Sequence, residues 1–392
     1  MRLPKHYSTS IDDLLINRDS QTIFLSTWDR NISENDVPME IINESVSITL
    51  EDISKYQYMD EMHELKEYIS NSISTKESQI SPSMIAIATN GTASAYLVLK
   101  TLAQKKHLRP LLLTPIYFTY ISSLKELCDS IEFSQVFYQE DIIINLSEIE
   151  HIITEESINT MIINDPIFGC GVAVKEEIYE LLAALCKKHE ITLIIDYVYG
   201  GMEWCEERWY LPHHLQRLLT KGLDIIVIDS LSKRLFINGI KSAVIYGPPS
   251  FICEIEKASV YTLGCMTYSL VSLIKELYDP HNIGTIFNAV NKNIINAKNN
   301  YQLICSLLLD KNCFIEKCDS GHFALIKIPY DILKMSANSC IAKSILEKCN
   351  VITIPHDRYL YFNDKYYCFR INLLSDRTSI LTGIRSIIKQ LC

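Results

Sequence analysis

A lysine follows directly after an apolar strand, among hydroxyl groups and close to a second cation. Lys233 lies just beyond the β-branched run 225–228, Ser230 and Ser232 precede it, and Lys241 follows eight residues later. Burial can desolvate a lysine amine until it becomes nucleophilic, and hydroxyls together with a cation can hold a phosphate. The pattern therefore predicts a lysine that forms a Schiff base next to a phosphate-binding site.

The composition is that of an ordinary globular protein. The 392 residues are 48% hydrophobic and 21% charged, and 37 basic against 47 acidic residues give a net charge of −10, which argues against nucleic acid as a partner. Neither a signal peptide nor a run long enough to cross a membrane is visible, and the cysteines are scattered through apolar stretches. From these features we expect a cytoplasmic protein. We also expect no metal site, because the histidines form no ligand pattern.

Apolar runs alternate with helical patterns from about residue 84 to 250. This alternation predicts a three-layer α/β/α large domain with a mostly parallel sheet, in which ligands bind at the carboxyl ends of the strands. The clearest helical pattern covers Val174–His189. The predicted strands are Met84–Thr89, Leu111–Thr114, Met161–Asn164, Thr192–Asp196, Ile225–Ile228 and Ala243–Tyr246.

A smaller α+β domain is expected after the breaker cluster at 279–284. Its predicted strands are Phe314–Ile328, Val351–Ile354 and Tyr366–Ile371, and its predicted helices are 286–309, Ala337–Lys348 and Asp376–Gln390. We therefore expect residues 1–49 to pack with the small domain, residues 50–285 to form the large domain and residues 286–392 to form the small one.

Further segments carry side chains that could complete a site around Lys233. The glycine in Asn90–Ala93 follows the first strand and opens a helix, where backbone N–H groups can bind phosphate. An aromatic residue in Pro115–Tyr120 could stack on a pyridine ring, and the carboxylate of Asp196 could keep a pyridine nitrogen protonated. Together with Lys233 and the late segment Phe369–Asn372, these segments resemble those of fold-type I pyridoxal 5'-phosphate (PLP) enzymes of the class I/II aminotransferase group. The resemblance covers about residues 50–375.

The resemblance implies a role for each of these side chains. Lys233 would form the Schiff base, Asp196 would face the pyridine nitrogen and Tyr199 the ring oxygen, which makes these three the catalytic candidates. Arg370 would bind the α-carboxylate of the substrate. The expected cofactor-binding residues are Gly91, Thr92, Ala93, Tyr117, Phe168, Asp196, Tyr199, Ser230, Ser232, Lys233 and Lys241.

Three positions depart from the family pattern. Lys241 stands where a phosphate-binding arginine is expected, and Ala243 where glycine is usual. In the segment that corresponds to N-P-x-N-P-T-G, Phe168 replaces the asparagine that contacts the ring oxygen, at a cost of about 1.5–3 kcal/mol for one lost hydrogen bond to a charged oxygen. Asn164 could take over this contact only if the loop followed a different path.

The expected activity is transfer of an amino group between an amino acid and a 2-oxo acid, with Lys233 as the acid and base at the substrate α-carbon. A non-transaminating PLP enzyme of specialised metabolism (a lyase, a cyclase or an amino-acid oxidase) is the first alternative. A non-catalytic binding protein is the second. The changes at Phe168 and Lys241 favour it slightly, whereas the intact Lys233, Asp196, Tyr199 and Arg370 argue against it.

The resemblance also implies a homodimer with sites at the subunit interface. Either Tyr56 or Tyr58 lies near the position of a family tyrosine that reaches the neighbouring subunit's phosphate, and the sequence does not decide between them. The loops expected to select the substrate, Ser20–Val37 and Gly200–His214, show no pattern that indicates a side-chain preference.

Overall fold

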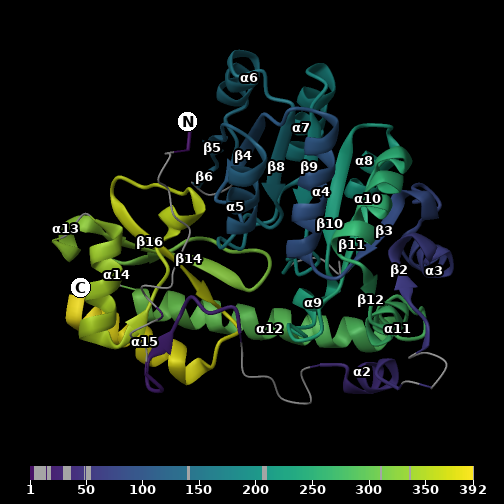
Figure 1. The fold of residues 1–392 in the computed structure, drawn as a ribbon. Helices are drawn as coiled ribbons and strands as arrows, with labels where there is room; N and C mark the ends of the chain where they lie inside the picture. Colours follow the sequence, from purple (N-terminus) through teal and green to yellow (C-terminus); the bar gives the residue numbers. More distant parts are fainter. Residues whose placement is uncertain are drawn as a thin grey trace.

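The structure of the chain is a computed structural model (Figure 1). It describes residues 1–3, 15, 19–29, 37–47, 49, 54–138, 142–204, 210–309, 311–334 and 337–391. No described helix is both long and apolar enough to span a membrane.

A seven-stranded sheet forms the centre of the larger part of the molecule, in the order β3-β11-β10-β9-β8-β4-β5. Within it, β11 pairs antiparallel with both of its neighbours, and the other pairs are parallel. The strands are β3 (Ile85–Ala88), β4 (Pro110–Thr114), β5 (Glu132–Gln135), β8 (Thr160–Asn164), β9 (Thr192–Asp196), β10 (Ile225–Asp229) and β11 (Ala243–Tyr246).

Alternate residues of these strands enter two separate hydrophobic cores. In β8, for example, Met161 and Ile163 belong to one core and Ile162 belongs to the other. The helices that pack in the first core include α3 (His63–Ile73), α6 (Leu146–Glu155), α7 (Glu176–Lys188) and α8 (His213–Thr220). Those in the second are α4 (Gly91–Lys105), α5 (Phe118–Leu127) and α10 (Pro249–Thr262). The expected three-layer fold is thereby confirmed, because each near-continuous apolar strand is covered on both faces.

A second, antiparallel sheet has the order β13-β14-β16 and packs with the C-terminal helices. Its strands are β13 (Phe314–Ile315), β14 (Phe323–Pro329) and β16 (Tyr366–Asn372), and its helices include α13 (Tyr330–Leu333), α14 (Asn338–Cys349) and α15 (Arg377–Leu391). The single strand expected at Phe314–Ile328 is wrong, because the chain reverses between β13 and β14 around Gly321, whose φ is +65°. The loop between them reaches the larger part, where Asp319 N and Ser320 N donate to the Gly171 carbonyl.

One long helix connects the two parts. Helix α12 (Ile283–Leu308) follows α11 (Tyr268–Leu277) and runs beneath the large sheet to the small one (Figure 1). The proposed domain boundary between residues 285 and 286 falls in its first turn and stays a proposal.

The N-terminal residues join different parts of the fold. The short β1 (Ile23–Phe24) pairs in parallel with β15 (Val351–Ile352), α2 (Met39–Ser45) contacts α11, and Arg2 bridges to Glu132 on β5. The remaining short elements are β2 (Gln57–Tyr58), β6 (Phe137–Tyr138), β7 (Ile142–Ile143), α9 (Leu231–Arg234), β12 (Cys265–Met266), η3 (Met59–Glu61), η4 (Pro82–Met84) and η5 (His356–Tyr359).

Candidate active site

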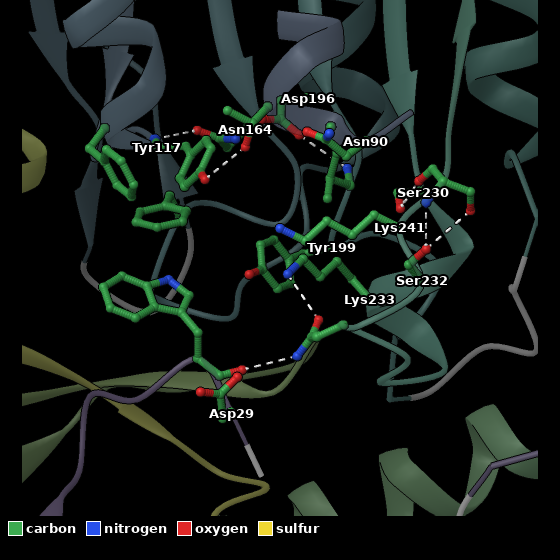
Figure 2. Close-up of a pocket in the computed structure, with 18 of the residues that line it drawn as sticks. Asp29, Asn90, Tyr117, Asn164, Asp196, Tyr199, Ser230, Ser232, Lys233 and Lys241 are labelled. Atoms are coloured by element: carbon green, nitrogen blue, oxygen red, sulfur yellow. Dashed lines mark hydrogen bonds between the residues drawn. The ribbon is translucent and has the colours of Figure 1, made fainter. Parts of the chain in front are cut away.

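A cavity of about 470 Å³ lies at the carboxyl ends of β8, β9 and β10. Figure 2 shows Asn164, Asp196 and Asn90 along one side, with Lys233 and Lys241 extending toward them. The residues that line the cavity are Leu15, Trp28, Asp29, Asn90, Gly91, Thr92, Tyr117, Phe118, Asn164, Phe168, Asp196, Val198, Tyr199, Ser230, Ser232, Lys233, Asn238, Lys241 and Ser242.

The Lys233 amine projects into the cavity from α9, which begins two residues after β10 ends. Its Nζ donates to Asn238 Oδ1 at 3.0 Å, and Asn238 Nδ2 donates to the Trp28 carbonyl at 3.3 Å. Burial, followed by the nearby charge of Lys241, lowers the pKa of Lys233 to about 8. Roughly a tenth of this amine is therefore neutral at pH 7, far more than for an ordinary lysine.

The Asp196 carboxylate ends β9 on the opposite side of the cavity. It is only 6% exposed, and its Oδ1 accepts a hydrogen bond from Val198 N at 3.1 Å. Burial raises the pKa of Asp196 to about 6, and the charge of Asp229 adds to this rise. A cationic partner in the cavity would lower that pKa again, because it favours the charged carboxylate.

Asn164 lies beside Asp196, because the last residues of β8 and β9 are register partners. Its Oδ1 accepts from Tyr117 N at 2.9 Å, so the side chain holds the loop that carries Tyr117. Phe168 also lines the cavity, which means that the loop after β8 brings both residues to the site.

The N-terminus of α4 forms the end of the cavity near Asn90. The Asn90 side chain caps the helix by accepting from Ala93 N at 2.9 Å. Among the described residues the N–H groups of Gly91 and Thr92 have no acceptor, and they lie where a helix N-terminus attracts anions. A Cβ on Gly91 would lie 2.8 Å from Val198 Cγ2, so the backbone approaches too closely for a larger residue.

Three serines tie the loop after Lys233 to β10. Ser230 Oγ donates to the Ser242 carbonyl at 2.5 Å, and Ser232 Oγ donates to the Ile240 carbonyl at 3.1 Å. Ser232 Oγ also accepts from Ser242 N at 3.0 Å. The exposed Lys241 follows Ile240 in this loop, so the serine network determines where its charge lies.

Aromatic rings cover the remaining wall. Tyr117 lies 5.5 Å from Phe168 between ring centroids, and its hydroxyl is 3.1 Å from Thr92 Oγ1. The Tyr199 ring lies 5.7 Å from Lys233 Nζ, and burial raises the pKa of its phenol above the ordinary value. The cavity thus combines an amine, a carboxylate, anion-binding N–H groups and stacking rings.

Arg370 lies behind this aromatic wall, on β16. It is fully buried, and its Nη2 donates to the Ser26 carbonyl at 2.9 Å. Its guanidinium carbon is 4.1 Å from the centroid of the Trp28 ring and 4.4 Å from that of Phe323. Its Nε and Nη1 have no hydrogen-bond partner in the described part of the chain, which leaves two charged donors for a carboxylate.

The structure brings most of the sequence-predicted residues into one cavity. Ala93 and Arg370 do not line it, because Ala93 N is used by the Asn90 cap and Arg370 is sealed by rings. Asn164, considered from the sequence only as a replacement for the missing asparagine, also lines it. So do residues that were not assigned from the sequence, among them Trp28, Asp29, Asn90, Phe118, Asn238 and Ser242. Asn90 and Asn164 could have been found as strand-end residues, whereas no local pattern indicated Trp28 or Asn238.

The tyrosines considered for contact with a second subunit lie elsewhere. Tyr56 is 73% exposed and stacks on Tyr58 with ring centroids 5.5 Å apart, and neither lines the cavity. Their role at a subunit interface stays a prediction. Of the loops expected to select the substrate, residues 30–36 and 205–209 lie outside the described residues.

The sequence matches the family model described as aminotransferase class I and II over residues 29–382. The chain therefore belongs to this family of transferases, whose members generally depend on PLP.

Individual relatives are distant. An aspartate aminotransferase from Thermotoga maritima is 22% identical over 231 residues, which span 58% of this chain and 59% of that relative. A Thermus thermophilus aspartate aminotransferase mutant has a TM-score of 0.81 at 13% identity and covers 98% of this chain and 97% of its own. An Escherichia coli protein with a methionine aminotransferase function has a TM-score of 0.80 at 15% identity, over 99% of this chain and 97% of its own. At these identities the solved structures establish the fold.

Proposed function

We propose that the protein is a PLP-dependent aminotransferase that acts on an amino acid and a 2-oxo acid, with Lys233 as the residue that carries the cofactor. The observation that carries the proposal is the pairing of two perturbed groups in one cavity. Lys233 has a lowered pKa of about 8, and the buried carboxylate of Asp196 has a raised pKa of about 6. Such pairs of groups, shifted by their surroundings, are typical of catalytic sites.

The residues present fit this cofactor. The N–H groups of Gly91 and Thr92 and the charge of Lys241 suit its phosphate, and Asp196 suits its pyridine nitrogen. Tyr117 offers a ring to stack on, and the Lys233 amine is available for covalent attachment. The orphaned N–H groups at the start of α4 are the observation that favours an anion, because the first N–H groups of a helix require acceptors.

When bound, PLP supplies an aldehyde that takes up an amino group and a ring that withdraws electrons from the substrate α-carbon. The side chains of this protein then determine how the proton moves. Lys233 Nζ would take the proton from the substrate α-carbon and deliver it to the cofactor carbon that holds the amino nitrogen, a role that suits an amine with a pKa near 8. Asp196 holds its negative charge toward the bound ring, and Tyr199 and Phe168 limit access of water on the side of the small sheet.

Arg370 supports the proposal at the substrate end. Its unpartnered Nε and Nη1 would bind the α-carboxylate as a two-pronged pair once the Trp28 ring has moved aside. The carboxylate would also remove the cost of leaving two charged donors unpaired in the interior. We further propose that the protein acts as a homodimer, a state that is common in soluble enzymes and that the exposed Tyr56 would suit.

The test is a two-stage half-reaction. Purified protein with PLP is titrated with a pool of amino acids, and the visible band of the bound cofactor should disappear. Addition of 2-oxo acids without further amino acid should then restore it, and Lys233→Ala should show neither change. Loss of the band without restoration would contradict the proposal and favour the lyase or oxidase alternative.

A further inference from the structure

One part of the cavity remains after the residues proposed for the cofactor are set aside. Lys233, Asp196, the start of α4 and the serine loop account for one end. The lining residues away from this group are Leu15, Trp28, Asp29, Phe118 and Phe168. The part of the cavity that they line, called here the substrate end, lies next to Arg370 and would receive the side chain of the amino acid.

Aromatic rings from three separate segments form its surface. The Trp28 ring meets Phe118 edge to face, at 6.5 Å between centroids and 73° between planes. Phe118 lies 4.6 Å from Tyr117, which in turn lies 5.5 Å from Phe168. The rings expose edges and faces at tilted angles, and a further ring could pack against them in the preferred edge-to-face or offset geometry.

The charged residues around the substrate end favour a substrate with a single carboxylate. Among the described lining residues the cations are Lys233 and Lys241, and both are assigned to the other end. Arg370 offers its two unpartnered donors to one carboxylate only. A second carboxylate on a substrate would lose its hydration here without a cation to offset the loss, and the charge of Asp29 would repel it.

We propose that the substrate is an amino acid with one carboxylate and an apolar, ring-bearing side chain, held by the rings of Phe118 and Phe168. This inference rests on the proposed function. It separates the protein from an enzyme for dicarboxylic amino acids, because none of the described residues that line the substrate end is a cation that could select a second negative charge.

Two unreactive carboxylates test the inference independently of catalysis. Binding of 3-phenylpropionate and of succinate to the PLP-loaded wild-type protein is measured by calorimetry. We expect 3-phenylpropionate to bind at least about tenfold more tightly, since ring packing adds to the contact made by one carboxylate. Succinate binding as tightly or more tightly would overturn the inference.

Substitution of Phe118 tests whether the aromatic surface causes the preference for 3-phenylpropionate over succinate. Phe118→Ala should lower the ratio of the two affinities by an amount on the order of tenfold, and Phe118→Leu should lower it less. Phe314→Ala, on the half-exposed β13 ring, is the matched control and should leave the ratio unchanged. A ratio that is unchanged in Phe118→Ala while the variant remains folded would overturn the role of the aromatic surface.

Single-turnover rates complete the test. The kcat/KM for L-phenylalanine should be higher than that for L-aspartate. A preference for L-aspartate, or for L-ornithine, which Asp29 could attract, would overturn the inference. If no amino acid reacts, the proposed function fails. The carboxylate affinities would still decide the substrate class, because they do not depend on turnover.

Discussion

At the scale of single residues, the Lys233 amine is kept in surroundings that disfavour its charge. Only Asn238 Oδ1 accepts from it among the described residues, and the charges of Lys241 and Arg370 oppose its protonation. When folding lowers the pKa of a lysine, the charged amine destabilises the folded protein relative to the unfolded chain. This penalty applies at every pH where the amine is charged in both states. This cost is what makes the amine reactive, and it is measurable without cofactor.

Lys233→Met should therefore stabilise the cofactor-free protein, by about 1–3 kcal/mol at pH 7. The folded-state pKa near 8 lies below the ordinary value of 10.5, so the penalty is fully present below pH 8. It declines as the pH rises from 8 to 10.5, and the advantage of the variant should shrink over the same range. Urea unfolding of both proteins at pH 7 and pH 10 measures it. A variant that is less stable at pH 7 would show that the amine is not disfavoured.

At the scale of elements, the loop between α9 and β11 depends on Ser232. Its hydroxyl is the acceptor for Ser242 N, and both residues are buried, so removal of the hydroxyl leaves a buried N–H without a partner. Ser232→Ala should lower the free energy of unfolding by about 1–3 kcal/mol. Ser81→Ala removes a hydroxyl of an exposed pair and should stay within about 0.5 kcal/mol of wild type. Equal effects of the two substitutions would contradict the structural role of this network.

Six of the seven strands of the large sheet could be predicted from the sequence because each is a short apolar run, and some of them end at a chemically distinctive residue. This is why Asp196 and Lys233 could be assigned without a structure. The seventh, β5, was not predicted, because its residues Glu132–Gln135 form no apolar run.

Trp28 could not be assigned from the sequence, because it follows β1, whose pairing with β15 joins residues more than 300 positions apart. Asn238 could not, because it lies in the loop between α9 and β11 without a local pattern that indicates a site. The reversal between β13 and β14 was also missed, although the polar link at residues 316–322, which contains Asp319, Ser320 and Gly321, is a turn signal in the sequence.

At the scale of the whole molecule, the two parts meet where Gly171 touches the link between β13 and β14. The Gly171 carbonyl accepts from Asp319 N at 2.9 Å and from Ser320 N at 3.0 Å. Its φ is +70°, and a Cβ there would lie 2.0 Å from the Phe323 carbonyl oxygen. The same loop carries Phe168, so this contact places the aromatic wall against the small sheet.

Gly171→Ala should destabilise the protein by about 3 kcal/mol or more, because backbone must shift to make room. Gly222→Ala is the matched control, since Gly222 has a φ of +68° and nothing within 4 Å of the added atom. It should cost only the conformational strain, about 1 kcal/mol. Thermal unfolding of both variants separates the two effects, and similar losses would contradict a close contact at Gly171.

The central claim is that Lys233 carries the cofactor covalently, and reduction with borohydride tests it most directly. Protein incubated with PLP is reduced, digested and mapped by mass spectrometry. We expect a phosphopyridoxyl group on the peptide that contains Lys233, at close to one per chain, and none on the peptide that contains Lys241. Predominant labelling of Lys241 or of another lysine, or no labelling at saturating PLP, would contradict the account.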